Sequence, residues 1–285
     1  MSNLDRIDYY PDDDRFKSWA FGAGIDAYVI DTGINPDHSD FEGRVLPGWH
    51  ASRFSDSEDS QGHGTHVASI LGGVLCGTAK DVTLIPVKVC GTTGCSTSDI
   101  LEGLNWIKSR VQQNKRLSVI NISLSGPYSS TYNDGVYAVL DAGIPVVVSA
   151  GIDDKGDACN KSPASVQGAL TVGATQRDDY LASFSNIGSC VDIYAPGKSI
   201  RGADYANNNG YISFRGTSTA SPHVAGAVAG LLQVLRDAGF YSQPSVNVVD
   251  DVNFLINRFA EKGTVKGLPS EDNNNVMLQT TCLTS

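Results

Sequence analysis

The sequence has few charged residues and no long hydrophobic run. Only 18% of its 285 residues are charged, below the roughly one quarter that is usual for soluble domains. The 21 Lys and Arg residues are outnumbered by 31 Asp and Glu residues, which gives a net charge of −10. Such a charge repels phosphate backbones and anionic lipids, so we expect neither nucleic acid nor a membrane surface as a partner. The longest apolar stretches, such as 225–235, are shorter than the roughly 20 residues that span a bilayer.

Signals that would divide the chain or target it are also missing. The first residues lack the apolar core of a signal peptide, and no repeat, low-complexity tract or Pro-rich linker interrupts the sequence. We therefore expect one domain over residues 1–285, with no propeptide or signal peptide. Since 41% of the residues are apolar, the chain can bury a large core, which excludes a disordered or fibrous protein.

The six cysteines include no Cys-x-x-Cys pair, which argues against a zinc site. An even number of cysteines fits an oxidising compartment with disulfides, and a cytosolic metal site is the competing interpretation.

Short β-branched runs alternate with helical patterns along the chain. Most of the runs are continuously apolar, which is typical of strands buried on both faces of a parallel sheet. Strands are predicted at 27–30, 83–89, 118–124, 145–150, 169–174 and 191–195. Helices are predicted around 67–75, after an N-cap at Asp99, at 132–142 closed by Gly143, and at 219–238 closed by Gly239. This alternation predicts an α/β fold with a mostly parallel sheet and helices on both faces.

Three segments place reactive side chains at a strand end or at a helix start, where parallel α/β folds collect their functional groups. Asp31 ends an apolar strand, His63 lies between two glycines before the first helix, and Ser218 opens the long helix after a Gly-Thr turn. Each also has a purely structural interpretation, since Asp31 could cap a turn and Ser218 could be an N-cap. His66 follows His63 too closely at a helix start for a metal pair, so we expect it to be packed or hydrogen-bonded.

Together, the three residues predict nucleophilic catalysis. A hydroxyl nucleophile needs a neutral base, and the base needs a carboxylate that fixes its tautomer and stabilises the imidazolium. We therefore predict that Ser218 attacks, His63 carries the proton and Asp31 orients His63. The first turn of a helix also presents backbone N–H groups that favour a developing anion, so the N–H of Ser218 is a predicted oxyanion donor.

The segments around these residues resemble the subtilisin family of serine proteases, in particular its proteinase K and aqualysin branch. The matching runs are VIDTG (29–33), GHGTHVA (62–68), GTS (216–218) and ASPHVAG (220–226), with shorter matches at 41–44, 162–164, 171–174 and 183–186. The resemblance extends from about residue 4 to 267. It implies a three-layer α/β subtilisin-like fold and a serine endopeptidase that forms an acyl-enzyme. It also implies a polypeptide substrate, no cofactor for the chemistry, a monomer and secretion, whereas a native start at Met1 would place the protein in the cytosol.

The sequence departs from this family at the oxyanion hole. By resemblance, an asparagine side chain should follow Gly151, but position 152 is Ile, which has no hydrogen-bond donor. Thr217 is the better replacement donor, because Asp153 would help only if protonated. Thr219 stands in place of a methionine just after the nucleophile. Three hypotheses remain: a slow protease, altered acyl-transfer chemistry, and a protein that binds peptides at a vestigial site.

The resemblance also assigns a peptide-binding cleft. Its walls would be Ser123, Leu124, Ser125 and Gly126 on one side, with Ser149, Ala150 and Gly151, and the opposite edge would contain Gly94 and Ser96. Backbone groups in the two walls would pair with an extended substrate as an added strand. Ser125 occupies a position that is usually Gly, so we expect a narrowed cleft, and the absence of charge favours an apolar or unselective cleaved residue. The alternative is that both runs are simply strand ends.

By resemblance, Cys159 and Cys190 form a disulfide, and Cys90 and Cys95 are close enough in sequence to staple one loop. Cys76 and Cys282 are then left over, paired or free. A structural calcium ion would be held by Asp192 and the backbone carbonyls of Gln167 and Ala169, all oxygen donors that suit a hard cation. A local hydrogen bond of Asp192 is the competing interpretation.

Overall fold

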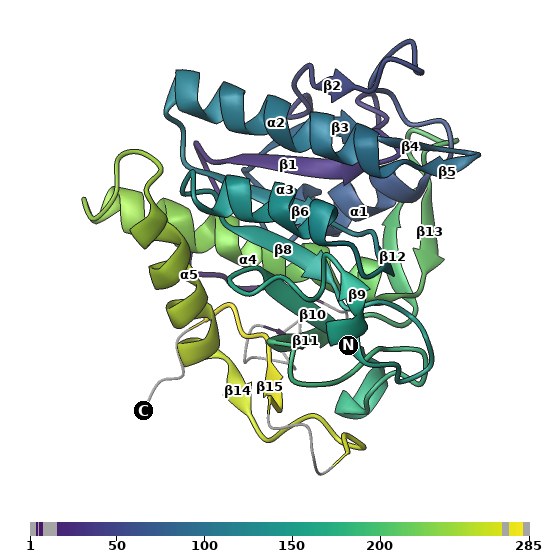
Figure 1. Cartoon of the computed structure of the whole chain (residues 1–285), viewed down its shortest axis with the longest axis vertical. Coiled ribbons are helices and arrows are strands. Elements are labelled where there is room, and N and C mark those ends of the chain that lie inside the picture. Colours follow the sequence, from purple (N-terminus) through teal and green to yellow (C-terminus); the bar gives the residue numbers. More distant parts are fainter. Residues whose placement is uncertain (1–3, 5, 8–15, 270–273, 282–285) are drawn as a thin grey trace.

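A nine-stranded sheet forms the centre of the protein (Figure 1). The computed structural model describes residues 4, 6–7, 16–269 and 274–281. The strands of the sheet are β1 (Asp26–Asp31), β2 (Trp49–His50), β3 (Thr83–Lys88), β6 (Ser118–Ile122), β8 (Val146–Ser149), β10 (Leu170–Thr175), β11 (Ile193–Pro196), β14 (Glu261–Lys262) and β15 (Val276–Met277). Their order is β14-β15-β11-β10-β8-β6-β1-β3-β2, and every pair is parallel except β14 with β15.

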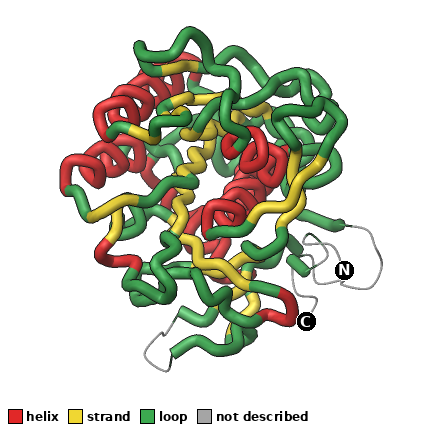
Figure 2. Tube along the Cα trace, turned by 90° about the vertical axis from the view of Figure 1, so that its right-hand side faces the viewer, coloured by secondary structure: helices red, strands yellow, loops and turns green. Residues whose placement is uncertain are grey.

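Helices cover both faces of this sheet. The helices are α1 (His63–Gly72), α2 (Thr97–Asn114), α3 (Ser130–Leu140), α4 (Thr217–Asp237) and α5 (Val246–Phe259). Alternate residues of β1 show the two layers, because Val29 packs in one core with α1 and α4 while Tyr28 packs in the other with α2 and α3. Figure 2 shows the strands enclosed by helices on either side. The predicted three-layer α/β fold is therefore confirmed.

Small two-stranded sheets surround this framework. They pair β4 (Cys90–Gly91) with β5 (Gly94–Cys95), β7 (Gly126–Pro127) with β9 (Lys161–Ser162), and β12 (Ile200–Ala203) with β13 (Tyr211–Phe214). Short 3₁₀ segments lie at Ala158–Asn160 and Arg177–Asp179. No helix among the described residues is both long and apolar enough to cross a bilayer.

The order of the strands determines where a site can form. From β1, the chain first adds β3 on one side and later adds β6, β8, β10 and β11 on the other. The connections after β1 and β6 therefore leave the sheet in opposite directions. In parallel α/β sheets a crevice opens at such a switch point, at the carboxyl ends of the strands. Asp31 is the last residue of β1, so it lies at the switch point.

The structure corrects one predicted helix cap and excludes the capping alternative for Ser218. Helix α2 begins one turn earlier than expected, with Ser96 as N-cap, and its side chain accepts the N–H of Asp99. Helix α4 begins after Gly216, so Ser218 lies inside the first turn and is not an N-cap. That placement removes the structural alternative for Ser218 and leaves its hydroxyl free of a capping role.

Candidate active site

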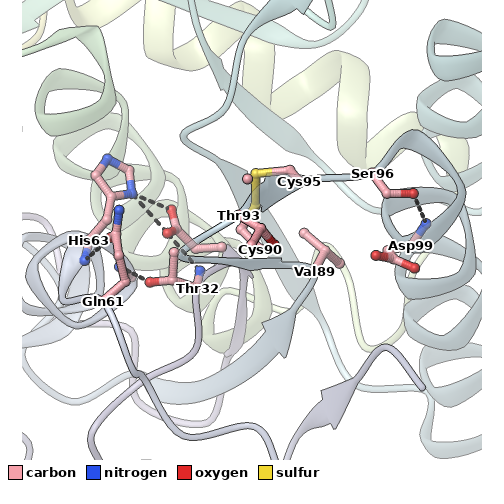
Figure 3. The surroundings of a disulfide bond; sticks show 12 residues. Thr32, Gln61, His63, Val89, Cys90, Thr93, Cys95, Ser96 and Asp99 are labelled. Carbon is pink, nitrogen blue, oxygen red and sulfur yellow. Dashed lines mark hydrogen bonds and ion pairs between the residues drawn. A yellow bond between two sulfur atoms is a disulfide. The ribbon is translucent and has the colours of Figure 1, made fainter. Parts of the chain in front are cut away.

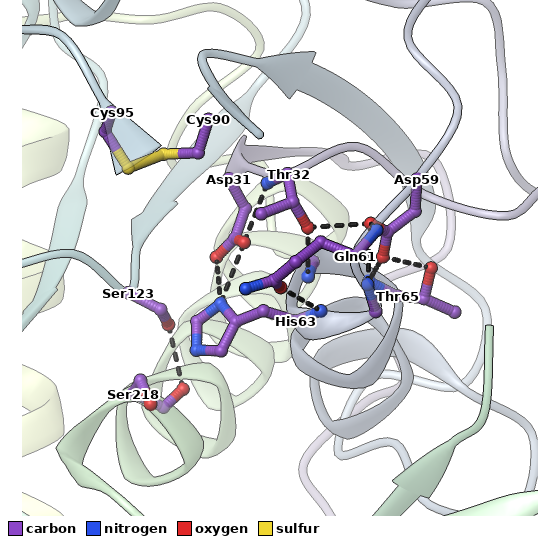
Figure 4. Close-up of polar contacts among 12 residues, drawn as sticks. Asp31, Thr32, Asp59, Gln61, His63, Thr65, Cys90, Cys95, Ser123 and Ser218 are labelled. Carbon is purple, nitrogen blue, oxygen red and sulfur yellow. Dashed lines mark hydrogen bonds and ion pairs between the residues drawn. A yellow bond between two sulfur atoms is a disulfide. The ribbon is translucent and has the colours of Figure 1, made fainter. Parts of the chain in front are cut away.

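Asp31 and His63 form a tightly coupled pair. The Asp31 side chain is fully buried, and Nδ1 of His63 lies 2.8 Å from its Oδ1 and 2.9 Å from its Oδ2 (Figure 4). Since a carboxylate only accepts, Nδ1 carries the proton and donates it to Asp31. The other ring nitrogen, Nε2, is then unprotonated and can accept a proton from a nucleophile.

Glycine at position 64 allows this close approach. A Cβ atom there would lie 2.2 Å from the carbonyl oxygen of Gly33 and 3.2 Å from Cβ of Asp31. Any larger residue would push the start of α1 away from the end of β1. The glycine beside the histidine therefore allows the carboxylate to reach the imidazole.

The carboxylate of Asp59 joins the two segments that carry this pair. Its Oδ1 accepts hydrogen bonds from the Thr32 hydroxyl (2.8 Å) and from the N–H groups of Gln61 and Gly62 (both 2.9 Å). Its Oδ2 accepts from the N–H (2.9 Å) and the hydroxyl (2.7 Å) of Thr65. The loop before α1 is thus fixed to the turn after β1. Sequence reasoning missed Asp59, because it lies in a polar run whose composition indicates only a solvated loop.

Neighbouring charges tune the base. Burial opposes protonation of His63, but the charge and hydrogen bond of Asp31, and the charge of Asp59, outweigh it and raise the pKa of His63 above its ordinary value. His63 therefore holds a proton more readily than a free imidazole does. This property favours a base that must take a proton from a hydroxyl group.

Ser218 lies beside His63 in the same cavity. In Figure 4 it lies on the opposite side of the imidazole from Asp31, at the start of α4. Both residues line a cavity of about 450 Å³. The structure therefore brings together the three residues that the sequence predicted, on a strand end and two helix starts.

Ser123 fixes the turn that carries the nucleophile. Its hydroxyl donates to the carbonyl oxygen of Ser218 at 2.9 Å and shares a hydrogen bond with the hydroxyl of Ser221, also at 2.9 Å. The amide of Asn121 donates to the same Ser123 oxygen. The Ser123 side chain is buried in this network, so it holds the end of β6 to α4 and does not face a substrate.

Ile152 follows Gly151, at the position where the family resemblance led us to expect a hydrogen-bond donor. Its side chain is 63% exposed, so it faces solvent and packs little. It supplies no hydrogen bond. Because Ser218 is in the first turn of α4, its N–H has no acceptor one turn earlier in the helix. That N–H remains available to an anion.

The neighbouring polar side chains are already engaged. The Thr217 hydroxyl donates to the carbonyl oxygen of Gly151 (3.2 Å) and accepts its N–H (3.1 Å), so its one proton is used. The Thr219 hydroxyl contacts the carbonyl oxygens of Gly197 and Gly216. Hydrogen bonds from Lys161 and Asn186 lower the pKa of Asp153, which is ionised at neutral pH and has no proton to donate.

The two predicted cleft walls differ in the backbone groups they leave free. Ala150 and Gly151 have partners inside the protein: the Ala150 N–H donates to Val172, and the carbonyl oxygens of both residues accept from Asn186. Ser149 is buried in β8. Leu124, Ser125 and Gly126 follow β6 and are not fully buried, and Gly126 also pairs with Ser162 in the small sheet of β7 and β9.

The opposite edge of the cleft is the hairpin of β4 and β5. The disulfide between Cys90 and Cys95 closes it, and Figure 3 shows this bond between the His63 region and Ser96 at the start of α2. Gly94 is exposed and Ser96 is half-buried. Both predicted edge residues therefore reach the surface beside the site.

The second predicted disulfide, between Cys159 and Cys190, is also present. Cys76 is a free thiol that is half-buried, and burial raises its pKa to about 11. Cys282 lies outside the described residues.

Asp192 meets part of the requirement for a cation site. One oxygen of its carboxylate accepts the N–H of Thr171 at 2.8 Å, as the competing interpretation required, and burial raises its pKa to about 6. A buried carboxylate with one hydrogen bond, and with no ion pair among the described residues, either keeps its proton or binds a cation. No cluster of three or more His, Cys, Asp or Glu side chains occurs in the described part of the chain. A cation would therefore depend on the carbonyls of Gln167 and Ala169, an all-oxygen set that suits calcium.

His66 is a packed histidine, as predicted. Its ring stacks on Phe214 with centroids 4.3 Å apart, and Nε2 lies 3.1 Å from the carbonyl oxygen of Ile200 and 3.2 Å from that of Ile212. Burial lowers its pKa to about 4, so the ring is neutral at pH 7.

Comparison with known proteins gives the same assignment. The model of the subtilase family matches residues 22–260, and the chain belongs to this family. An extracellular serine proteinase of Thermus sp. (strain Rt41A) is 47% identical over 81% of this chain and 56% of its own length. Alkaline serine exoprotease A of Vibrio alginolyticus is 43% identical over 81% of this chain and 43% of its own length. The chain thus spans about half the length of these relatives.

Solved structures agree over nearly the whole chain. A cold adapted subtilisin-like serine proteinase superposes with a TM-score of 0.88 at 36% identity, and the alignment covers 99% of each chain. A protease of Pseudoalteromonas arctica PAMC 21717 superposes with a TM-score of 0.76 at 26% identity, covering 92% of this chain and 89% of the other.

Proposed function

We propose that the protein is a secreted serine endopeptidase that hydrolyses peptide bonds through an acyl-enzyme. The observation that carries the proposal is the contact of both Asp31 carboxylate oxygens with His63, which in turn lines one cavity together with Ser218. The two disulfides and the extracellular relative support an oxidising, extracellular location.

The reaction follows from this arrangement. Nε2 of His63 takes the hydroxyl proton of Ser218 as its oxygen attacks the peptide carbonyl carbon, and the resulting imidazolium is stabilised by Asp31. The tetrahedral oxyanion lies at the first turn of α4, where the N–H of Ser218 donates to it. His63 then gives the proton to the leaving amine, and water, activated by the same ring, hydrolyses the acyl-serine.

We propose that the enzyme is slow, because Ile152 has no donor for the oxyanion. An oxyanion donor is worth about 10²–10³-fold in turnover where it has been removed from subtilisin. A triad with one remaining donor still exceeds uncatalysed hydrolysis by a wide margin. We propose a structural calcium ion at Asp192, which takes no part in the chemistry.

A fluorophosphonate probe tests the proposal directly, because it reacts only with an activated serine. We expect labelling of the folded protein at Ser218, confirmed by peptide mapping, and none in the Ser218→Ala variant. Ser109→Ala is a matched control, since this serine is exposed on α2 and takes no part in the site. Cleavage of a denatured protein substrate should follow the same pattern.

The exposed Ile152 favours one second candidate, a peptide-binding protein with an inactive site. That candidate predicts no labelling at Ser218 together with micromolar peptide binding in the cleft. Labelling that equals the level in heat-denatured protein would favour it over the protease.

A further inference from the structure

The cavity that contains His63 and Ser218 is otherwise lined by residues that the catalytic steps do not use. They are Ser199, Ser213, Phe214 and Arg215, from the turn before β12 and the end of β13. Neither predicted cleft wall contributes to this lining. Because His63 must deliver a proton to the leaving amine, the side of the cavity it shares with these residues receives the leaving segment of the substrate.

Arg215 supplies a positive charge to this side. Its side chain is exposed, and among the described residues it has no ion pair or hydrogen bond. No carboxylate is among the residues that line the cavity in the described structure. The protein as a whole has a net charge of −10, so a positive charge without a partner stands out at this site. A guanidinium that has no carboxylate beside it favours the binding of an anionic ligand.

The backbone on both sides of Arg215 is fixed. Phe214 pairs with Ile200 across the hairpin and its ring stacks on His66. Gly216 donates its N–H to the carbonyl oxygen of Gly197 at 2.8 Å. The backbone that carries Arg215 is therefore held in place, three residues before the nucleophile.

Two hydroxyl groups complete a surface suited to a carboxylate. Ser199 and Ser213 are exposed, line the same cavity, and have no hydrogen bond among the described residues that would occupy their protons. A guanidinium with hydroxyl donors nearby matches the acceptor oxygens of a carboxylate.

We propose that Arg215 is a specificity-determining residue that binds a carboxylate on the leaving segment of the substrate, one or two residues after the cleaved bond. The carboxylate belongs either to an Asp or Glu side chain or to the free C-terminus of a short leaving segment. This inference rests on the proposed peptidase function and defines its substrate class as peptides that are acidic after the cleavage site.

The test uses internally quenched peptides with an amidated C-terminus that differ only by Glu, Gln or Lys at each of the first three positions after the cleaved bond. At low ionic strength we expect kcat/KM for Glu to exceed that for Gln by about 2–5-fold at one of the first two positions, as for an exposed ion pair. The preference should shrink in 0.5 M NaCl because salt screens exposed charges. A second set, with Gln and either an amide or a free acid two residues after the bond, separates the side-chain source from the C-terminal source.

Variants connect the preference to one side chain. Arg215→Gln should abolish it, and Arg215→Glu should reverse it in favour of Lys. Arg201→Gln is the matched control, since Arg201 lies on the paired strand, stacks over Tyr211 at 4.4 Å and does not line the cavity. Equal rates for Glu and Gln in the wild type, or a preference that persists in Arg215→Gln, would overturn the inference.

Failure of the peptidase function itself gives a different result, because no peptide would be cleaved. Calorimetric titration of the same peptides then decides the inference. Tighter binding of the Glu peptides that is lost in Arg215→Gln supports it, and equal binding contradicts it.

Discussion

The hydroxyl of Thr32 donates a hydrogen bond of 2.8 Å to Oδ1 of Asp59, and it also accepts the N–H of Gly64 at 2.9 Å. This one hydroxyl joins the residue after Asp31 to the residue after His63. The relative position of the Asp31 carboxylate and the imidazole therefore depends on a second carboxylate, that of Asp59, which makes no hydrogen bond to the imidazole.

Replacing Asp59 by Asn should lower kcat/KM by about 10–100-fold, because hydrogen bonds to a charged group are worth roughly 1.5–3 kcal/mol and the amide would face N–H donors with its own. The acidic limb of the pH profile should also move to lower pH, since the charge of Asp59 raises the pKa of His63. Asp56→Asn, in the same loop but exposed, is the control. An unshifted limb in Asp59→Asn would leave Asp59 with a purely structural role.

Restoring a donor at position 152 should accelerate the enzyme. Ile152→Asn should raise kcat by about tenfold or more, with little change in KM, because the new amide contacts the oxyanion only after attack. Ile152→Leu controls for the change of side chain at this exposed position. Equal kcat in all three proteins would mean that another group already supplies the donor.

The pH dependence of activity follows from the raised pKa of His63. Only the neutral imidazole can accept the Ser218 proton, so activity should fall as the pH drops through a pKa higher than that of free histidine. Asp31→Asn removes the main cause of the increase, so the limb should move to lower pH while kcat falls by about 10⁴-fold, as in other triads. If the acidic limb of the pH profile lies at the same pH in the wild type and in Asp31→Asn, a group other than His63 is titrating.

Histidine protonation also affects stability. Because the folded pKa of His63 is above the unfolded value, the protonated imidazole contributes stability below the unfolded pKa, and this contribution is lost as the pH rises through the folded pKa. Asp192 acts in the same direction, since its pKa of about 6 exceeds the ordinary 3.8. Without a cation, ionising Asp192 between about pH 4 and 6 destabilises the fold.

Calcium should therefore raise the melting temperature more at pH 8 than at pH 5, and a chelator should reverse the effect. The ionised, buried Asp192 needs a counter-ion at pH 8, whereas the protonated acid at pH 5 does not. Asp192→Asn should abolish the calcium response, and Asp134→Asn, which alters an exposed carboxylate on α3, should preserve it. An equal response in the Asp192 variant would place any bound ion elsewhere.

The two disulfides should differ in what they stabilise. Cys159 and Cys190 are 31 residues apart, and Cys90 and Cys95 only 5. Because a disulfide lowers the entropy of the unfolded chain, the bond that closes the longer loop should raise the free energy of unfolding by about 4 kcal/mol. The bond that closes the shorter loop should raise it by about 2 kcal/mol. Denaturant unfolding of the paired Cys→Ser variants measures both. Removing Cys90–Cys95 should mainly raise KM, because the bond closes the edge of the cleft. A larger loss of stability on removing Cys90–Cys95 than on removing Cys159–Cys190 would contradict this account.

The sequence predicted the sheet well and the hairpin beside the site poorly. All six predicted strands are present within one or two residues, since strands buried on both faces are continuous apolar runs. Strands β12 and β13 were missed because each has only four residues of mixed exposure, too few to show the alternation of apolar and polar residues that indicates a strand. Helix α5 was missed because its buried face consists of Val248, Val249, Val252 and Ile256, β-branched residues that favour strands.

The triad was predictable because each of its residues lies in a short segment with its own chemical signature. The network around it was not, because Asp59 and Ser123 act through bonds to residues distant in sequence. The engagement of Thr217 by Gly151 likewise requires two segments 66 residues apart to meet. Hydroxyl and carboxylate residues in loops look alike until their partners are known.

Helix α4 has almost no solvent-facing surface over its first four turns, and it packs beneath β6, β8, β10 and β11. Its amide protons should be among the last to exchange with deuterium, since they open only when the whole domain does. The nucleophile is thus attached to a deeply buried helix, whereas Leu124, Ser125 and Gly126, which would hold a peptide, are exposed or only partly buried. On heating, affinity should weaken gradually and the reactive serine should disappear abruptly, at the same temperature as the fold.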